Sequence, residues 1–166
     1  MHELALTEKR CLDAVEGWLE LGNLHQARQE LLNFPRSSLS DPQVMERLWI
    51  LCARAGDWDS CLMLGHALTV VDPDRPENWL MRAVALRELG RIDSAWIMLS
   101  EARERFPEHS MIPFNLACCA CDHGNLENAC AMLAAAFRLH ENEEDLKLIA
   151  LCDPALEPLW NQVMEL

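Results

Sequence analysis

The sequence predicts an all-α protein made of four successive helical hairpins followed by C-terminal capping helices. Three observations carry this prediction. Glycines recur at one constant interval, at Gly22, Gly56, Gly90 and Gly124, and glycine commonly follows the last residue of a helix. A small residue stands five positions after each of them, at Ala27, Cys61, Ala95 and Ala129. Between these positions, apolar residues follow the three- and four-residue spacing of a helix.

The clearest hairpin runs from Pro76 to Pro107. Each half presents one apolar face at helical spacing, formed by Trp79, Ala83 and Leu86 and then by Ala95, Leu99 and Ala102. Gly90 lies where the first helix has to end and the chain has to turn. The small residues of the second half would let the two helices pack closely.

In chain order, the period places the hairpins at about residues 8–41, 42–75, 76–109 and 110–143, with the cap at 144–166. Asp41-Pro42 and Asp153-Pro154 predict helix starts, because aspartate caps a helix and proline fits its first position. Ser110 and Asn142 are further predicted N-caps. Stacked hairpins leave an apolar face at the end of the series, so we expect residues 144–166 to cover it within a single domain, 1–166.

The second hairpin departs from the pattern at Trp49 and Gly65. Trp49 stands where the next two copies have Ala83 and Ala117, and Gly65 stands where the other copies have leucine. One interpretation is a volume exchange, in which the absent side chain at Gly65 makes room for the Trp49 indole. A locally shifted register, with Ala67 packing instead, is the alternative.

This period and these motifs resemble the tetratricopeptide repeat (TPR) family over roughly Glu8 to Glu143. The resemblance implies an α-α superhelix, or solenoid, of four TPR-type hairpins whose first helices line a concave groove. No acyl-transfer elbow, phosphate-binding glycine loop or zinc-protease helix occurs in the sequence. We therefore predict a protein with no enzymatic activity and no cofactor.

The groove is the predicted binding site. Helical spacing of the first helices places an apolar anchor in it, with charged residues and one thiol beside the anchor. These residues are Glu46, Ile50, Arg54, Leu80, Val84, Arg87, Phe114 and Cys118. An apolar patch with a charged rim fits a peptide or helical segment, whose carboxylate Arg54 and Arg87 would orient. Alternatively, these residues contact the cap or a second copy of the chain.

The predicted function is therefore protein–protein interaction, as a module or scaffold that binds a protein or peptide. A second hypothesis is a chaperone for secreted bacterial proteins, because such chaperones are similarly small, acidic and built from these repeats. A further possible partner is a second copy of the chain. It would bind to apolar residues of the C-terminal cap that stay exposed.

Charge and composition limit the partners and the compartment. The chain has 27 acidic and 14 basic residues and a formal charge of −13, so it would repel phosphate backbones and anionic lipids. We expect no nucleic-acid and no membrane partner. The first residues lack the basic start and apolar stretch of a signal peptide, and the eight cysteines are not spaced as a disulfide framework. These features predict a cytoplasmic protein.

One cluster of thiols raises a different hypothesis, a thiol- or zinc-dependent protein. It consists of Cys118, Cys119, Cys121, His123 and Cys130. Structural zinc sites use pairs of cysteines presented by loops, with a second pair elsewhere, whereas these cysteines fall within a predicted helix. Cysteine also packs well as a small buried residue. We therefore predict a packing role and no metal site.

Overall fold

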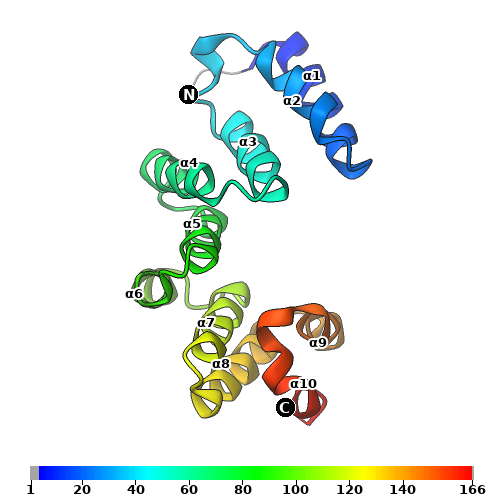
Figure 1. Ribbon diagram of the computed structural model, residues 1–166. Helices are drawn as coiled ribbons and strands as arrows, with labels where there is room; N and C mark the ends of the chain where they lie inside the picture. The colour runs from blue at the N-terminus through cyan, green and yellow to red at the C-terminus, as the bar shows by residue number, and fades with distance from the viewer. Residues whose placement is uncertain (1–3, 166) are drawn as a thin grey trace. The chain divides into compact units, whose positions relative to one another are not determined.

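The computed structural model describes residues 4–165, which form α-helices and short 3-10 helices without a β-strand (Figure 1). The α-helices are α1 (Leu6–Glu20), α2 (Leu24–Leu32), α3 (Pro42–Arg54), α4 (Trp58–Val71), α5 (Pro76–Glu88), α6 (Ile92–Arg105), α7 (Met111–Asp122), α8 (Leu126–Leu139), α9 (Glu143–Cys152) and α10 (Trp160–Val163). The 3-10 helices are η1 (Arg36–Ser38) and η2 (Pro154–Leu159). Within the described range, no helix is both long and apolar enough to cross a membrane. The all-α prediction is confirmed.

The chain divides into two compact units, Met1–Ala85 and Leu86–Leu166, with the boundary inside α5. The first unit holds α1 to α4 and most of α5, and the second holds α6 to α10 with η2. The prediction of a single domain over residues 1–166 remains a prediction. Coincident unfolding transitions from probes placed in the two units would be its signature.

A glycine with positive φ follows the first helix of each predicted hairpin. The φ angles are 70°, 73°, 70° and 72° at Gly22, Gly56, Gly90 and Gly124. This is the left-handed region, where a side chain is unfavourable. The residue after each glycine donates its amide to a carbonyl five residues earlier, as from Asn125 to Ala120 at 2.9 Å. This hydrogen bond is typical of the Schellman motif, so the predicted helix ends are confirmed and explained.

Three of the four turns continue into a capped helix. The side chains of Asn23, Asp57 and Asn125 accept hydrogen bonds from amides three residues on, at 3.1, 3.2 and 3.1 Å. Arg91 occupies this position in the remaining turn, with φ −92° and ψ 54° and without a side-chain cap. An arginine has only donors to offer, and its positive charge lies at the positive end of the helix dipole.

We expect Arg91→Asn to raise the free energy of unfolding by about 1 kcal/mol, because it adds the missing acceptor to a backbone that already has the capping geometry. Urea denaturation followed by circular dichroism measures the change. The reverse substitution, Asn125→Arg, serves as the matched control and should lower stability by a similar amount. An unchanged or lower midpoint for Arg91→Asn would contradict the proposed role of the cap.

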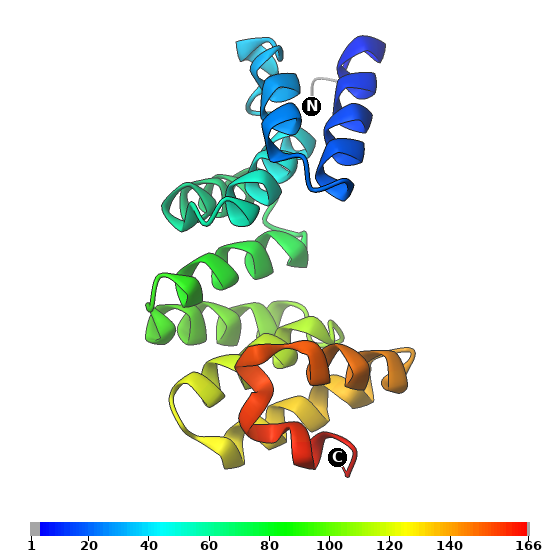
Figure 2. The ribbon, with the colours of Figure 1, turned by 45° about the vertical axis from the view of Figure 1, so that its right-hand side comes forward.

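The first unit has a core between its first three helices. In Figure 2, α1 and α2 lie side by side and run in opposite directions. Buried residues that pack together here are Leu4, Leu12, Val15, Leu19, Ala27, Leu31, Phe34, Val44 and Leu51. The start of α5 is tied to the end of α4 by the buried amide of Asn78, which donates to the carbonyls of Leu68 and Asp72 at 3.3 and 2.8 Å. Helix α5 thus begins at Pro76, as predicted.

Gly65 in α4 lies against the backbone of α5. A Cβ atom placed on Gly65 would be 2.9 Å from the Cα of Arg82 and 3.0 Å from its Cβ and N atoms. The indole of Trp49 instead packs edge to face on Trp58, with 6.5 Å between ring centroids. The close approach of Arg82 therefore explains the glycine without a role for Trp49, and the volume exchange with Trp49 stays a prediction.

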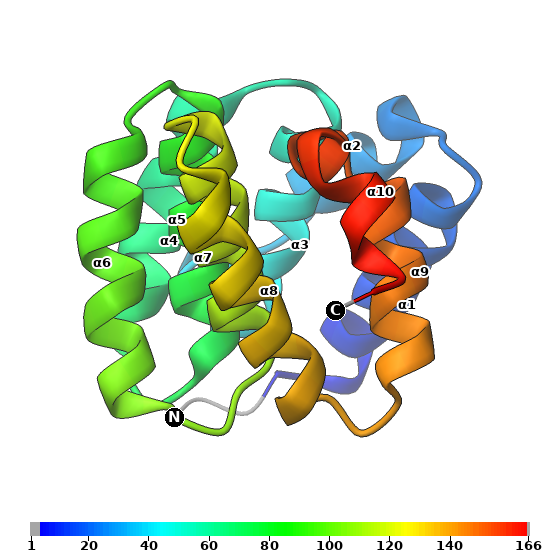
Figure 3. The same cartoon turned by 90° about the horizontal axis from the view of Figure 1, so that it is seen from below.

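The second unit has a continuous core that runs from α7 and α8 into the C-terminal segment, whose α9 and α10 lie next to each other in Figure 3. Leu146, Ala150, Leu156, Leu159 and Val163 are all fully buried in it. The segment therefore packs on the α7/α8 hairpin, as a cap is expected to do.

Two predicted N-cap residues stand at the N-cap positions of α7 and α9 but do not cap these helices with their side chains. Ser110 makes no capping hydrogen bond, and its hydroxyl lies 2.9 Å from Nδ1 of His140. The amide of Asn142 donates to the carboxylate of Asp145 at 2.7 Å instead of accepting from the backbone. The two aspartate-proline starts are confirmed, since Asp41 and Asp153 each accept an amide hydrogen bond at 2.9 Å.

Candidate functional site

The predicted apolar anchor is partly accessible in the first unit. Ile50 on α3 and Leu80 and Val84 on α5 are all half-buried. Leu80 and Val84 lie one turn apart and share a face of α5. Ile50 packs partly against the core of the unit. We call these three residues the α3/α5 face.

The charged residues predicted beside this face are engaged by neighbouring helices. Glu46 is buried and forms an ion pair with Arg75, which also lies 3.3 Å from Glu77. Arg54 donates from its guanidinium to the carbonyl of Leu19 in α1. A cation at the C-terminal end of a helix is favourable, because the last carbonyls lack partners there. Glu46 thus ties α3 to the residue that precedes α5, and Arg54 ties α3 to the end of α1.

The two predicted site residues on α7 are in a different position. Phe114 is 3% exposed and Cys118 is 0% exposed, and both belong to the core that includes Leu156 and Leu159. Neither side chain is available to a ligand while η2 covers α7. For these two residues, the prediction of an open groove is corrected in favour of the alternative, contact with the cap. Sequence spacing identifies a helix face but not the segment that folds back onto it.

Arg87 lies in an acidic environment in the second unit. Its guanidinium is 3.6 Å from a carboxylate oxygen of Asp122 and 3.6 Å from one of Glu88. Burial would by itself lower the pKa of Arg87, but its interactions with Cys118, Asp153 and Asp122 outweigh burial and raise the pKa. The guanidinium therefore stays charged and attracts the carboxylates of α7 and of the segment that follows α9.

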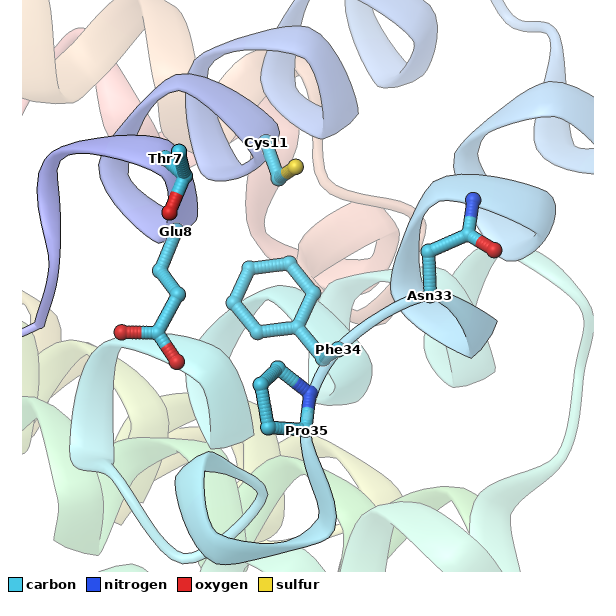
Figure 4. A pocket seen from close by; sticks show the side chains of 6 residues that line it. All are labelled: Thr7, Glu8, Cys11, Asn33, Phe34 and Pro35. Atoms are coloured by element: carbon cyan, nitrogen blue, oxygen red, sulfur yellow. The ribbon is translucent and has the colours of Figure 1, made fainter.

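A small cavity lies between the start of α1 and the chain that follows α2, with the Phe34 ring at its centre (Figure 4). It measures about 170 Å³ and is lined by Thr7, Glu8, Cys11, Asn33, Phe34 and Pro35. Glu8 already accepts hydrogen bonds from the backbone of Ala5 and from Ser38. Small-molecule sites are usually larger, about 300–1,000 Å³, with polar groups directed at the ligand. We therefore place the functional site elsewhere.

Comparisons with known proteins agree with this architecture. MamA MSR-1 C2 is similar to the chain with a TM-score of 0.65 and 18% identity, over 80% of this chain and 76% of that chain. PcrH, in complex with the chaperone binding region of PopB, is similar with a TM-score of 0.56 and 21% identity, over 80% of this chain and 97% of that chain. No family model and no curated protein matches the chain. The fold is a TPR-like helical repeat. At these identities, the likeness concerns the fold.

In the TPR-like fold, the thiol cluster lies in the tightly packed α7/α8 hairpin. Burial raises the pKa of Cys119 and of Cys121 to about 11, and it also raises the pKa of Cys118. These thiols therefore stay protonated near neutral pH, whereas the thiolate is the nucleophile and the metal ligand. Within residues 4–165, no three histidine, cysteine, aspartate or glutamate side chains are grouped so that they could hold a metal ion. The environment of these thiols favours a role in packing over a role as nucleophiles or metal ligands.

Proposed function

We propose that the chain is a protein-interaction module that binds a peptide or helical segment on the α3/α5 face. One observation carries the proposal: Ile50, Leu80 and Val84 are half-buried, whereas Phe114 and Cys118, one repeat period after Leu80 and Val84, are covered by a segment of the chain itself. The same repeat positions therefore accept an apolar segment where one is within reach. A partly exposed apolar strip on helices fits the helix-in-groove mode of recognition.

The charged residues support the selectivity of this face. Arg54 is exposed, and its hydrogen bond to Leu19 uses one of the five donors of the guanidinium. The remaining donors could orient a carboxylate of a ligand on this face. For the second unit by itself, we propose that Arg87, beside Asp122, orients a carboxylate there. Glu46 is part of the proposal only as a buried residue of α3 that holds Arg75 beside the first unit's face. Cys118 belongs to the core of the second unit and is not part of this face.

The test is affinity capture with two matched double variants. Leu80→Asp/Val84→Asp places charges on the proposed face, and Met63→Asp/Val70→Asp places the same charges on exposed positions of α4, where Met63 is 68% and Val70 is 66% exposed. We expect the α5 variant to retain its partners roughly ten-fold less well than the wild type, since a few apolar anchors carry most of the binding energy of an interface.

The α4 variant should capture the same partners as the wild type. Circular dichroism and urea unfolding establish that both variants are folded. If a folded Leu80→Asp/Val84→Asp protein retained every partner at wild-type levels, the proposed face would be wrong.

A chaperone for secreted proteins is the second candidate. PcrH is similar over 97% of its length, and its structure holds the chaperone binding region of PopB. Eight free thiols, four of them buried, are consistent with a reducing compartment, and we propose that the protein acts in the cytoplasm. A chaperone would keep a co-expressed, aggregation-prone partner soluble, whereas a scaffold would not.

A homo-oligomer through the cap ranks below these roles. On the exposed face of α9, Leu148 is 60% and Ile149 is 48% exposed. Glu144 and Asp145 are exposed on the same helix. Two copies brought together there would place like charges side by side, which opposes association.

A further inference from the structure

We infer that the α7 face of the second unit is itself a ligand site, occupied by the chain's own residues 153–163, and that its external ligand is an amphipathic segment with an aspartate at its start and leucines three and six residues later. This inference rests on the proposed function, because it treats the α7 face as a further copy of the proposed binding surface. The occupant is described by the chemistry of the segment that lies there.

The first step is the position of the site. Phe114 and Cys118 come one full period after Leu80 and Val84, so they are the same repeat positions on the next first helix. In the second unit these positions belong to one buried cluster with Leu156 and Leu159, and α7 packs against η2. The segment thus packs at the repeat positions that correspond to the proposed α3/α5 face.

The second step is the character of the segment. Leu156, Leu159 and Val163 are fully buried, and they follow one another at spacings of three and four residues. The intervening residues Glu157 and Pro158 are exposed. An apolar stripe at this spacing with a polar opposite side is how a helical peptide lies in a groove.

The third step is polar recognition at the start of the segment. One carboxylate oxygen of Asp153 accepts the amide of Ala155 at 2.9 Å and so begins η2. The other oxygen lies 3.8 Å from the sulfur of Cys118. The positive charge of Arg87, which lies 3.6 Å from a carboxylate oxygen of Asp122 at the end of α7 and also attracts Asp153, favours an anion at this point. We infer that the Asp153 carboxylate sets the position of Leu156 and Leu159 along α7.

The fourth step is the small number of bonds that hold the segment. Trp160 donates from its indole to the carbonyl of Ala150 at 3.1 Å, and the Cys130 thiol lies 2.8 Å from the side-chain oxygen of Gln162. Pro154 and Pro158 have no amide hydrogen to donate. The contact is therefore dominated by apolar side chains, and a separate peptide of the same pattern can supply the same groups.

The test uses the full-length chain and a fluorescein-labelled peptide of residues 153–165. In Leu156→Glu/Leu159→Glu the internal segment is released, so we expect this variant to bind the peptide at least roughly ten-fold more tightly than the wild type does, because the wild-type site is already filled. The peptide carrying the same two glutamates should not bind. Leu148→Glu/Ile149→Glu, on the exposed face of α9, is the matched control and should bind like the wild type.

Hydrogen exchange of the wild-type protein tests the inference even if Leu156→Glu/Leu159→Glu does not fold. We expect the amides of residues 155–157 and 159–163 to exchange roughly ten-fold faster than those of α7 and α8, because the segment opens without unfolding the hairpin. Equal exchange rates, or a folded released variant that ignores the peptide, would show a purely structural cap and overturn the inference. Loss of partner capture by Leu80→Asp/Val84→Asp would still support the proposed function in that case.

Discussion

Replacing Gly65 by leucine is expected to destabilise the first unit by roughly 3 kcal/mol or more, at or above the upper end of typical overpacking costs. The reason is the position of Arg82, whose Cα would lie 2.9 Å from a Cβ on Gly65. Backbone atoms of a packed helix cannot rotate away as a flexible side chain can. Helices α4 and α5 would have to separate, and the buried hydrogen bonds of Asn78 to the end of α4 would weaken with them.

Gly65→Ala distinguishes the steric cost of a side chain at this position from the effect of helix propensity on stability. Alanine in a helix interior is normally more favourable than glycine by about 0.5–1 kcal/mol. Gly17 in α1 is the matched control, because a Cβ there meets nothing within 4 Å. We expect Gly17→Ala to stabilise the protein by this amount and Gly65→Ala to destabilise it by about 1–3 kcal/mol. Urea unfolding of the three variants measures the difference.

A double variant distinguishes this explanation from the volume exchange between Gly65 and Trp49. If the indole filled the space at Gly65, Trp49→Ala would relieve the strain of Gly65→Leu. The contact with Arg82 predicts instead that the loss of unfolding free energy in Trp49→Ala/Gly65→Leu is at least the sum of the losses in the two single variants. Rescue in the double variant would favour the exchange and contradict the role given to Arg82.

The regular part of the fold is predictable from sequence because its determinants are local. Gly56 must adopt a positive φ, and Asp57 after it caps the next helix through bonds within a few residues. Asp41-Pro42 and the start of α5 at Pro76 are recognisable for the same reason. The glycine turns recur once in every period of the sequence, so each copy supports the interpretation of the others.

The parts that the sequence does not determine depend on tertiary contacts. Ser110 and Asn142 have the composition of N-caps, but His140 and Asp145 offer their side chains other partners. The ion pair of Glu46 with Arg75 joins residues 29 positions apart, which no helical periodicity indicates. The docking of residues 153–163 on α7 is of the same kind, because Asp153-Pro154 specifies a helix start but not the surface that receives the helix.

Phe137→Ala is expected to destabilise the second unit by about 3–5 kcal/mol, the usual cost of deleting a buried phenylalanine ring. Phe137 is 2% exposed, and it packs with Leu146 of α9 in the core of the unit. The ammonium of Lys147 lies 5.6 Å from the ring centroid and 2.7 Å from a carboxylate oxygen of Glu143. The ring thus holds α9 against α8 through both apolar and cation–π contact.

Two further substitutions separate the apolar and the cation–π contributions of Phe137 to the free energy of unfolding. Phe137→Leu keeps an apolar side chain, so we expect a smaller loss, about 1–2 kcal/mol. Lys147→Met keeps the buried stem but removes the charge, and its loss should stay below about 2 kcal/mol because the cation–π term is a minor part of the contact. Urea unfolding monitored by tryptophan fluorescence measures all three variants.

Phe137→Ala also tests whether α9 helps to hold residues 153–163 on α7. When α9 separates from α8, the segment that begins at Asp153 loses its anchor, and Cys118 beneath it becomes accessible. The Cys118 thiol should therefore react with an aromatic disulfide reagent faster in Phe137→Ala than in the wild type, under conditions where both proteins are folded. Lys147→Met should leave that rate unchanged. A folded Phe137→Ala protein with a thiol as protected as the wild type would mean that residues 153–163 hold to α7 without help from α9.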